Sequence, residues 1–203
     1  MAKKDLPKEL QALYFPSPKE PVFVDVPPMQ FAMVDGAGDP NSSKGFQEAI
    51  GALYGVAYTA KFAAKKRGIR EVMVMPLEGL FWTEGSDVFI PDDKGQWHWT
   101  LMLMEPPAVT RKLFDDSVRE LRERKNPPGL SRIRLEKWKE GKAAQILHVG
   151  PYSAERPTIE RLHAFIRDNG YRLSGKHHEI YMGNPQRSAP EKLKTVVRQP
   201  MSR

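Results

Sequence analysis

Large apolar residues recur at every fourth position between residues 42 and 68, and this spacing predicts the clearest helix of the chain. The series comprises Phe46, Ile50, Tyr54, Tyr58 and Phe62, which i, i+4 spacing places on one helix face. Ser42 or Ser43 can cap the start and Gly68 can end the helix. Gly51 and Gly55 lower the helix propensity, so we expect close packing there, against a sheet.

The rest of the chain alternates between strand-like and helix-like segments. Helices are predicted at 109–125 and 155–170, where Pro157 lies in the first turn and Gly170 just past the end. Strands are predicted at 22–38 (interrupted by Pro27-Pro28), 70–82, 96–106, 171–182 and 191–201, and a hairpin at 131–153 that turns near Glu140-Gly141. Residues 72–75 are apolar on both faces, as expected for a covered strand.

The two halves follow one plan, because in each a strand ends in glycine, a helix follows, and two strands come next. This order predicts an α+β domain built from two βαββ repeats, with pseudo-twofold symmetry, an antiparallel sheet, helices on one face and a central ligand groove. We expect an extended, proline-rich arm at 1–19 and a single domain at 20–203. The repeats would occupy about 20–106 and 107–203.

Composition and charge narrow the class of protein. The chain has 40% hydrophobic and 28% charged residues and no cysteine, which is typical of a globular protein without disulfides. No apolar run could cross a membrane and the N-terminus lacks the core of a signal peptide, so we expect a cytoplasmic protein. Residues 107–203 carry 21 Lys and Arg against 11 Asp and Glu. Basic and acidic residues are interspersed along the predicted helices, and no nucleic-acid-binding motif accompanies them. This pattern favours a solvated surface over direct nucleic-acid binding.

The segment KHHEIYMGNP, residues 176–185, places an acid inside a strand-like sequence. Alternation puts His177, Glu179 and Tyr181 on one strand face and Ile180 on the other. Neighbouring histidines then point to opposite faces, so a metal site is not favoured, and both histidines are interpreted as bystanders. No nucleophile elbow, phosphate loop or dinucleotide fingerprint occurs, and we expect no cofactor.

A ligand pocket fits the remaining pattern better. Glu78 and Glu179 fall at matching places in the two repeats, and the pseudo-twofold axis could bring them toward one groove. Aromatic residues occupy strand positions nearby, namely Phe81, Trp82, Trp97, Trp99 and Tyr181. Aromatic faces give apolar walls and attract cations, and a carboxylate among them pairs with a cation or moves a proton. The alternative is that these tryptophans belong to the core and that Glu78 lies at a surface strand end.

Four segments carry a resemblance to a known family: PLEGLFW, WHWTLMLMEP, HVGPYSAERPTIERLHAFIRDNGY and HHEIYMGNPQRSAPEKLKTVVRQP. Together with the ALYGVAYTAKF helix they resemble the GyrI-like small-molecule-binding family, which includes effector domains of AraC- and MerR-type multidrug regulators. The similarity spans most of residues 20–201. It implies two βαββ units around a groove for lipophilic, often cationic aromatic compounds. It also implies that the pocket glutamate is Glu179, with Tyr181 beside it, and that Trp82 and Trp99 form the aromatic wall.

The family's uses leave several functions open. We expect no helix-turn-helix module in the 203 residues. We therefore do not expect a complete transcription factor. The LEGLFW and EIY segments resemble the bacterial branch that hydrolyses cyclopropane-bearing, DNA-alkylating compounds, in which Glu179 would act on water and Tyr181 would hold the drug. A binder of planar lipophilic xenobiotics, with or without hydrolysis, is therefore the leading prediction. The alternative is an inhibitor of DNA gyrase or another protein-interaction regulator.

Overall fold

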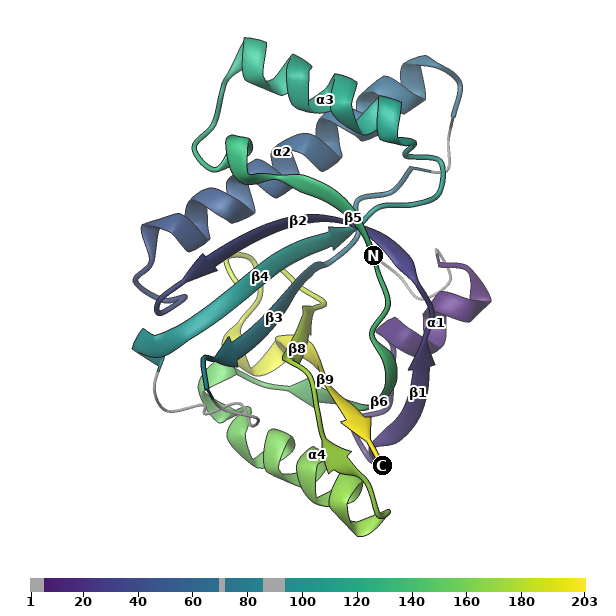
Figure 1. Ribbon diagram of the computed structural model, residues 1–203, viewed down its shortest axis with the longest axis vertical. Coiled ribbons are helices and arrows are strands. Elements are labelled where there is room, and N and C mark those ends of the chain that lie inside the picture. The colour runs from purple at the N-terminus through teal and green to yellow at the C-terminus, as the bar shows by residue number, and fades with distance from the viewer. Residues whose placement is uncertain (1–5, 70–71, 86–93) are drawn as a thin grey trace. The chain divides into compact units, whose positions relative to one another are not determined.

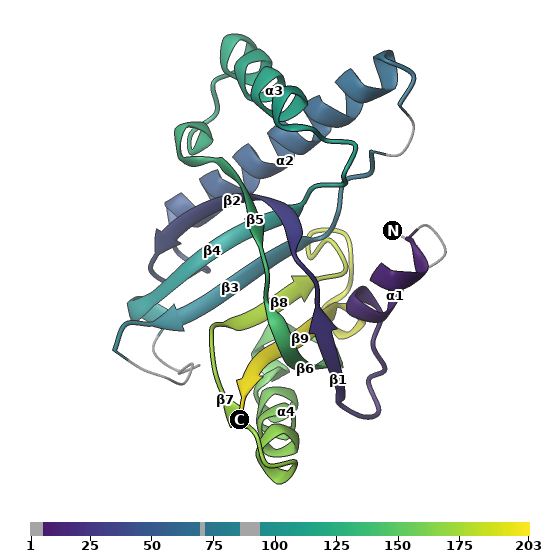
Figure 2. The ribbon, with the colours of Figure 1, turned by 45° about the vertical axis from the view of Figure 1, so that its right-hand side comes forward.

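The computed structural model describes residues 6–69, 72–85 and 94–203, which form helices and antiparallel strands (Figures 1 and 2). The helices are α1 (Lys8–Tyr14), α2 (Lys44–Lys66), α3 (Arg111–Arg124) and α4 (Arg156–Asp168). The strands are β1 (Val22–Val26), β2 (Met29–Ala37), β3 (Leu77–Thr83), β4 (Trp97–Met104), β5 (Arg134–Trp138), β6 (Gly141–Val149), β7 (Arg172–Leu173), β8 (His177–Tyr181) and β9 (Lys194–Ser202). The predicted α+β class with antiparallel strands is confirmed.

The chain divides into two compact units, and each unit is built from segments that are not contiguous in the sequence. Unit 1 takes the described residues within 1–27, 78–93 and 139–203, and unit 2 takes those within 28–77 and 94–138. The predicted repeat boundary near residue 106 falls inside unit 2. The repeat pattern could not show that the two units alternate along the sequence, because strand pairing brings together segments that are far apart in sequence.

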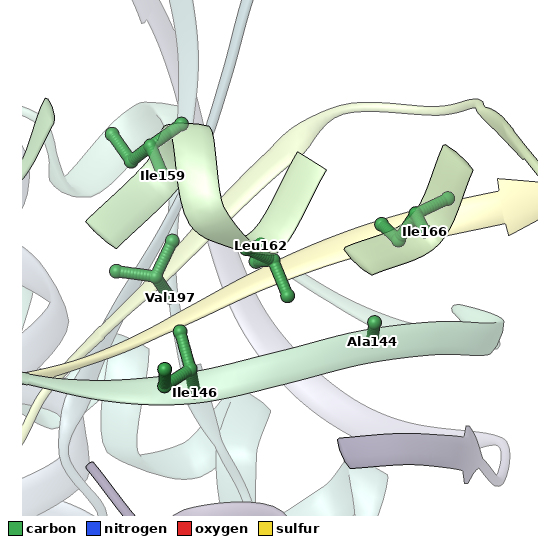
Figure 3. Close-up of a cluster of buried hydrophobic side chains, with 6 residues drawn as sticks. All are labelled: Ala144, Ile146, Ile159, Leu162, Ile166 and Val197. Carbon is green, nitrogen blue, oxygen red and sulfur yellow. The ribbon is translucent and has the colours of Figure 1, made fainter. Parts of the chain in front are cut away.

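In unit 1 the strands follow the order β1-β6-β9-β8-β3, with β7 paired to β9. Helix α4 packs on one face of this sheet, where apolar side chains of the helix and of two strands form a core (Figure 3). That core comprises Ala144, Ile146, Ile159, Leu162, Ile166 and Val197. The spacing of the α4 members follows the period of a helix with one buried face.

In unit 2 the strands follow the order β4-β2-β5. Ser43 caps α2 by accepting a hydrogen bond from the backbone N–H of Phe46. The Phe46 ring meets Trp99 of β4 edge-on, with 5.1 Å between ring centroids. Trp99 also lies over Gly36 of β2, its ladder partner, where a side chain would leave no room for the indole. Trp99 is therefore a core residue beneath α2.

Three predicted elements differ from the structure. Residues 131–153 do not form a hairpin, because β5 pairs with β2 whereas β6 pairs with β1 and β9. Residues 72–75 precede β3, which begins after Pro76, a residue without a backbone N–H to join a ladder. The first residues of that predicted strand, Arg70 and Glu71, lie outside the described residues. The predicted extended arm contains α1, which begins directly after Pro7.

The prolines at 27 and 28 do more than interrupt a strand. They separate β1, which pairs with β6, from β2, which pairs with β4 and β5. In the described part of the chain, no helix is both long and apolar enough to span a bilayer.

Substituting the glycine under the Trp99 ring tests this core. In Gly36→Ala the added Cβ would lie 2.2 Å from the indole, so we expect a loss of about 1–3 kcal/mol in the free energy of unfolding. The control is Gly51→Ala on α2, where an added Cβ meets nothing within 4 Å. That change should be stabilising by about 0.5–1 kcal/mol through helix propensity. Urea denaturation measures both, and equal stability of the two variants would contradict this packing.

Candidate functional site

Four charged side chains of unit 1 form a buried cluster. They are Glu78 of β3, Glu140 just before β6, His178 of β8 and Arg198 of β9, each with a side chain no more than 1% exposed. The His178 ring lies between two carboxylates: Nδ1 is 2.9 Å from Oε1 of Glu140 and Nε2 is 3.0 Å from Oε2 of Glu78. Arg198 Nη1 donates to Oε2 of Glu140 at 3.0 Å. Two negative and two positive groups therefore neutralise one another in this cluster.

The geometry around His178 fits an imidazolium. Both ring nitrogens face carboxylate oxygens, and only the protonated ring can donate from both. Burial alone would lower the pKa of His178, but the Glu140 carboxylate and the hydrogen bonds to both acids outweigh it and raise the pKa above its usual value. The histidine interpreted as a bystander is thus the centre of the cluster, and that interpretation was wrong.

Glu140 is held in its ionised form by the same contacts. Burial alone would raise its pKa, but the charges of His178 and Arg198, with their hydrogen bonds, lower the pKa of Glu140 to about 2. The sequence suggested a turn at this residue, and its side chain is instead 0% exposed.

The segment that contains α1 closes over this cluster within unit 1. Tyr14 donates its hydroxyl to Oε1 of Glu78 at 2.5 Å. Two backbone carbonyls of α1 accept further bonds: Ala12 from Gln145 at 2.7 Å and Leu13 from Arg198 at 2.8 Å. Burial and the adjacent Glu78 charge raise the pKa of the Tyr14 hydroxyl well above its usual value, so it remains a donor at neutral pH.

The buried cluster lies on the sheet face opposite α4. Arg198 pairs with Gln145 and His178 across the ladders, and Gln145 also accepts a bond from Arg198 at 2.9 Å. The neighbouring Val197 points into the core under α4 (Figure 3). Since side chains alternate along a strand, Arg198 and its partners project from the other face.

Glu179 lies on the α4 face, because its ladder partner is Val197. It accepts a hydrogen bond from Tyr181 at 2.7 Å and lies 3.2 Å from Nε2 of His177, as the predicted shared face requires. This placement corrects the expectation that Glu78 and Glu179 project toward one groove, since the two acids lie on opposite faces of the unit 1 sheet. The role of Glu179 and Tyr181 in binding stays a prediction.

The predicted aromatic residues fall on different surfaces. Trp82 lies four residues beyond Glu78 on β3 and so shares its face, while Phe81 is buried on the other. Lys176 places its ammonium 3.3 Å from the centroid of the Trp82 ring, so this indole face already holds a cation. Trp99 and, by alternation, Trp97 lie on the α2 side of unit 2, which corrects the expectation that Trp99 forms a ligand wall.

Sequence reasoning missed four residues of the cluster: Tyr14, Glu140, His178 and Arg198. Arg198, a charged residue directly after two valines in a predicted strand, was an available signal, since buried charges occur where partners meet them. Tyr14 and Glu140 gave no such signal, because Tyr14 lies in the predicted arm and Glu140 at a predicted turn. No group of three or more His, Asp or Glu arranged to hold a metal ion occurs among the described residues.

Comparisons with known proteins agree with this fold. Residues 19–200 match the GyrI-like small molecule binding domain family. The chain is 37% identical to an uncharacterized conserved protein from Listeria innocua, with a TM-score of 0.87 over 96% of this chain and 98% of that one. It is 35% identical to a structure from Listeria innocua described as a hydrolase, with a TM-score of 0.83 over 96% and 98% of the two chains.

A more distant solved structure shares the fold only. The C-terminal domain of EcmrR is 12% identical, with a TM-score of 0.55 over 91% of this chain and 98% of that one. No curated protein is a significant match to this chain.

Because Glu140 is ionised in the folded state, the free energy of unfolding depends on pH in the acidic range. Its folded pKa of about 2 lies below the unfolded value of 4.5, so its contribution is present above pH 4.5 and is lost as pH falls toward 2. Over this range we expect the wild type to lose up to about 3 kcal/mol more unfolding free energy than Glu140→Gln does. Urea titrations at several pH values measure this. Glu123→Gln, at an exposed site on α3, is the control and should follow the wild type. If the unfolding free energies of Glu140→Gln and wild type fall equally as the pH is lowered, the result would contradict the buried ion pairs.

Proposed function

We propose that this chain, which belongs to the GyrI-like small-molecule-binding family, binds planar, lipophilic, positively charged aromatic compounds through Glu78 and Trp82. The observation that carries the proposal is that these two side chains project from one face of β3, four residues apart. At strand spacing they are separated by about 13 Å along the strand. This face has an aromatic, half-buried end at Trp82 and an acidic, buried end at Glu78.

The aromatic end suits a cationic ring system. Trp82 is half-buried and already carries the ammonium of Lys176 on its face, at 3.3 Å. The electron-rich face of an indole attracts cations, and a flat aromatic cation adds apolar contact area that an ammonium lacks. Such a ligand would displace the flexible lysine side chain from the ring.

The acidic end supplies a positioned carboxylate. One Glu78 oxygen accepts from Tyr14 and the other from His178, which fixes the carboxylate orientation. Each carboxylate oxygen has a second lone pair, so it can also accept from a ligand ammonium or a water. Because the site is shielded from solvent, a charge–charge contact there is stronger than at the surface.

Hydrolysis is the reaction this surface would support. A Listeria innocua relative with 35% identity is described as a hydrolase, and the sequence resembles the branch that acts on cyclopropane-bearing alkylators. In such a step a water oxygen bonds to a strained ring carbon as a ring C–C bond breaks. The bond's electron pair passes to the conjugated carbonyl of the drug. Glu78 would orient the water and accept its proton, which then returns to the substrate.

A pair of isosteric substitutions tests which acid binds. In Glu78→Gln, affinity for the cationic dye rhodamine 6G should fall at least about ten-fold, because the carboxylate charge is lost. Fluorescence anisotropy measures this, with the anionic fluorescein as a matched probe that should bind neither protein. Glu179→Gln, on the α4 face, should bind like wild type. The opposite result, with binding lost only in Glu179→Gln, would place the ligand on the α4 face and contradict the proposal.

Catalysis is tested separately. Wild-type protein incubated with a cyclopropane-bearing alkylator should yield the ring-opened water adduct, detected by mass spectrometry. We expect Glu78→Gln to reduce the rate about 10²–10⁴-fold, the range typical of a general base. Tyr14→Phe should reduce it less, because His178 still orients the carboxylate. If wild type binds the dye yet yields no adduct, the chain is a binder without this activity.

A further inference from the structure

Unit 2 carries a groove between α2 and α3 that neither Glu78 nor Trp82 belongs to. We propose that this groove docks an acidic amphipathic helix of a partner protein. Its volume is about 930 Å³. Its lining comes from α2 and the C-terminal part of α3, with aromatic residues and glycines on α2 and basic residues on both helices.

An aromatic ladder forms one wall of the groove. Tyr54, Tyr58 and Phe62 follow one another at i, i+4 and i+8 on α2, with ring centroids 6.3 and 6.4 Å apart. Tyr58 is 48% and Phe62 57% exposed. The four-residue spacing predicts one helix face, and Gly51 and Gly55 predict close packing against a sheet. The outer part of that face is instead open to solvent, and exposed contiguous apolar surface of this kind marks a binding site.

Glycines shape the floor of the groove. At Gly55 an added Cβ would lie 2.8 Å from Leu121 of α3, so this glycine lets the two helices approach closely. Gly51 is different, because an added Cβ would meet nothing within 4 Å. Packing within the described residues therefore gives no reason for a glycine at 51, which is unfavourable inside a helix. Its absent side chain leaves room for an occupant against the α2 backbone.

Basic residues flank the ladder at both ends. Lys65 and Lys66 lie in the last turn of α2, and Arg124 and Lys125 at the end of α3. The helices run antiparallel, because Arg67 pairs with Asp116 while Gly55 meets Leu121 farther along α3. One basic pair therefore lies at each end of the groove.

The charge balance of the groove calls for an anionic occupant. None of the four cations forms an ion pair or side-chain hydrogen bond within the described ranges, and Glu120 is the one acid in the lining. The lining thus has four positive groups against one negative. An occupant with carboxylates near both ends and apolar side chains between them matches this arrangement.

The length of the groove favours a helix over a compact molecule. From Gly51 to Lys65 is fourteen residues along α2, or roughly 21 Å at 1.5 Å per residue. A helix of similar length spans both basic ends and presents side chains at i, i+4 and i+7 to the ladder, the usual mode of helix-in-groove recognition. A second copy of this chain fits poorly, because a two-fold contact through a groove that is positive at both ends brings like charges together.

A designed peptide tests the groove directly. The probe is a fluorescein-labelled peptide of about 16 residues, with leucines along one helical face and glutamates elsewhere, and its counterpart has lysines in place of the glutamates. We expect saturable binding of the acidic peptide alone, seen by fluorescence anisotropy and weakened by salt. Gly51→Leu, which fills the open floor, should abolish binding, and Lys65→Glu with Arg124→Glu should weaken it at least about ten-fold.

Matched controls separate docking from damage to the fold. Arg122→Glu reverses a charge on the same helix outside the groove lining and should bind like wild type. All variants should keep their circular dichroism spectra and their affinity for rhodamine 6G, so failure here is distinguishable from failure of the small-molecule site. Equal binding of the two peptides, or full binding by Gly51→Leu, would overturn the proposal.

Two other occupants give distinct outcomes that would also overturn it. Sedimentation velocity would show a wild-type dimer that Phe62→Glu dissociates, if a second copy covers the ladder. Saturable binding of the anionic dye 8-anilinonaphthalene-1-sulfonate, lost in Gly51→Leu while the acidic peptide does not bind, would identify a small lipophilic anion instead.

Discussion

Unit 1 depends on the placement of His178 between the carboxylates of Glu78 and Glu140. Removing four charged groups from water is costly unless each meets a partner of opposite charge. Here His178 and Arg198 each meet carboxylate oxygens at about hydrogen-bond distance, 2.9–3.0 Å. The cluster joins β3, β8, β9 and the residue before β6, and α1 is tied to it through Tyr14 and two backbone carbonyls. Loss of one member would leave another charge buried without compensation.

The same constraint would prepare Glu78 for the proposed ligand. Tyr14 and His178 fix both carboxylate oxygens before any ligand arrives, so little conformational freedom remains to be lost on binding. A segment near the N-terminus thereby supports the proposed ligand residues of β3, together with His178 of β8. This arrangement makes the proposed ligand site and the stability of unit 1 properties of one network.

Local pattern was sufficient for the three longer helices, though not for α1, and for strand alternation. The four-residue period predicted α2, and the segments around Arg111–Arg124 and Arg156–Asp168 are helices as predicted. Alternation correctly placed His177, Glu179 and Tyr181 on one face of β8. It could not say which face meets α4, because a strand's sequence has the same period whichever side a helix covers. The family resemblance favours Glu179 as the pocket acid, and the role of Glu179 in binding stays a prediction.

Taken alone, the sequence determined the α+β class, the family, and a set of acids and aromatic residues that included Glu78 and Trp82. Period and propensity are local properties, so they can be read along the chain. The tertiary structure decided which of these residues meet: it brought Tyr14, Glu78, Glu140, His178 and Arg198 together and placed Trp99 under α2. Those side-chain contacts join residues up to 100 positions apart, and the bond from Arg198 to the Leu13 carbonyl joins residues 185 apart. The strand pairing that creates them is settled by burial and charge compensation in the folded chain.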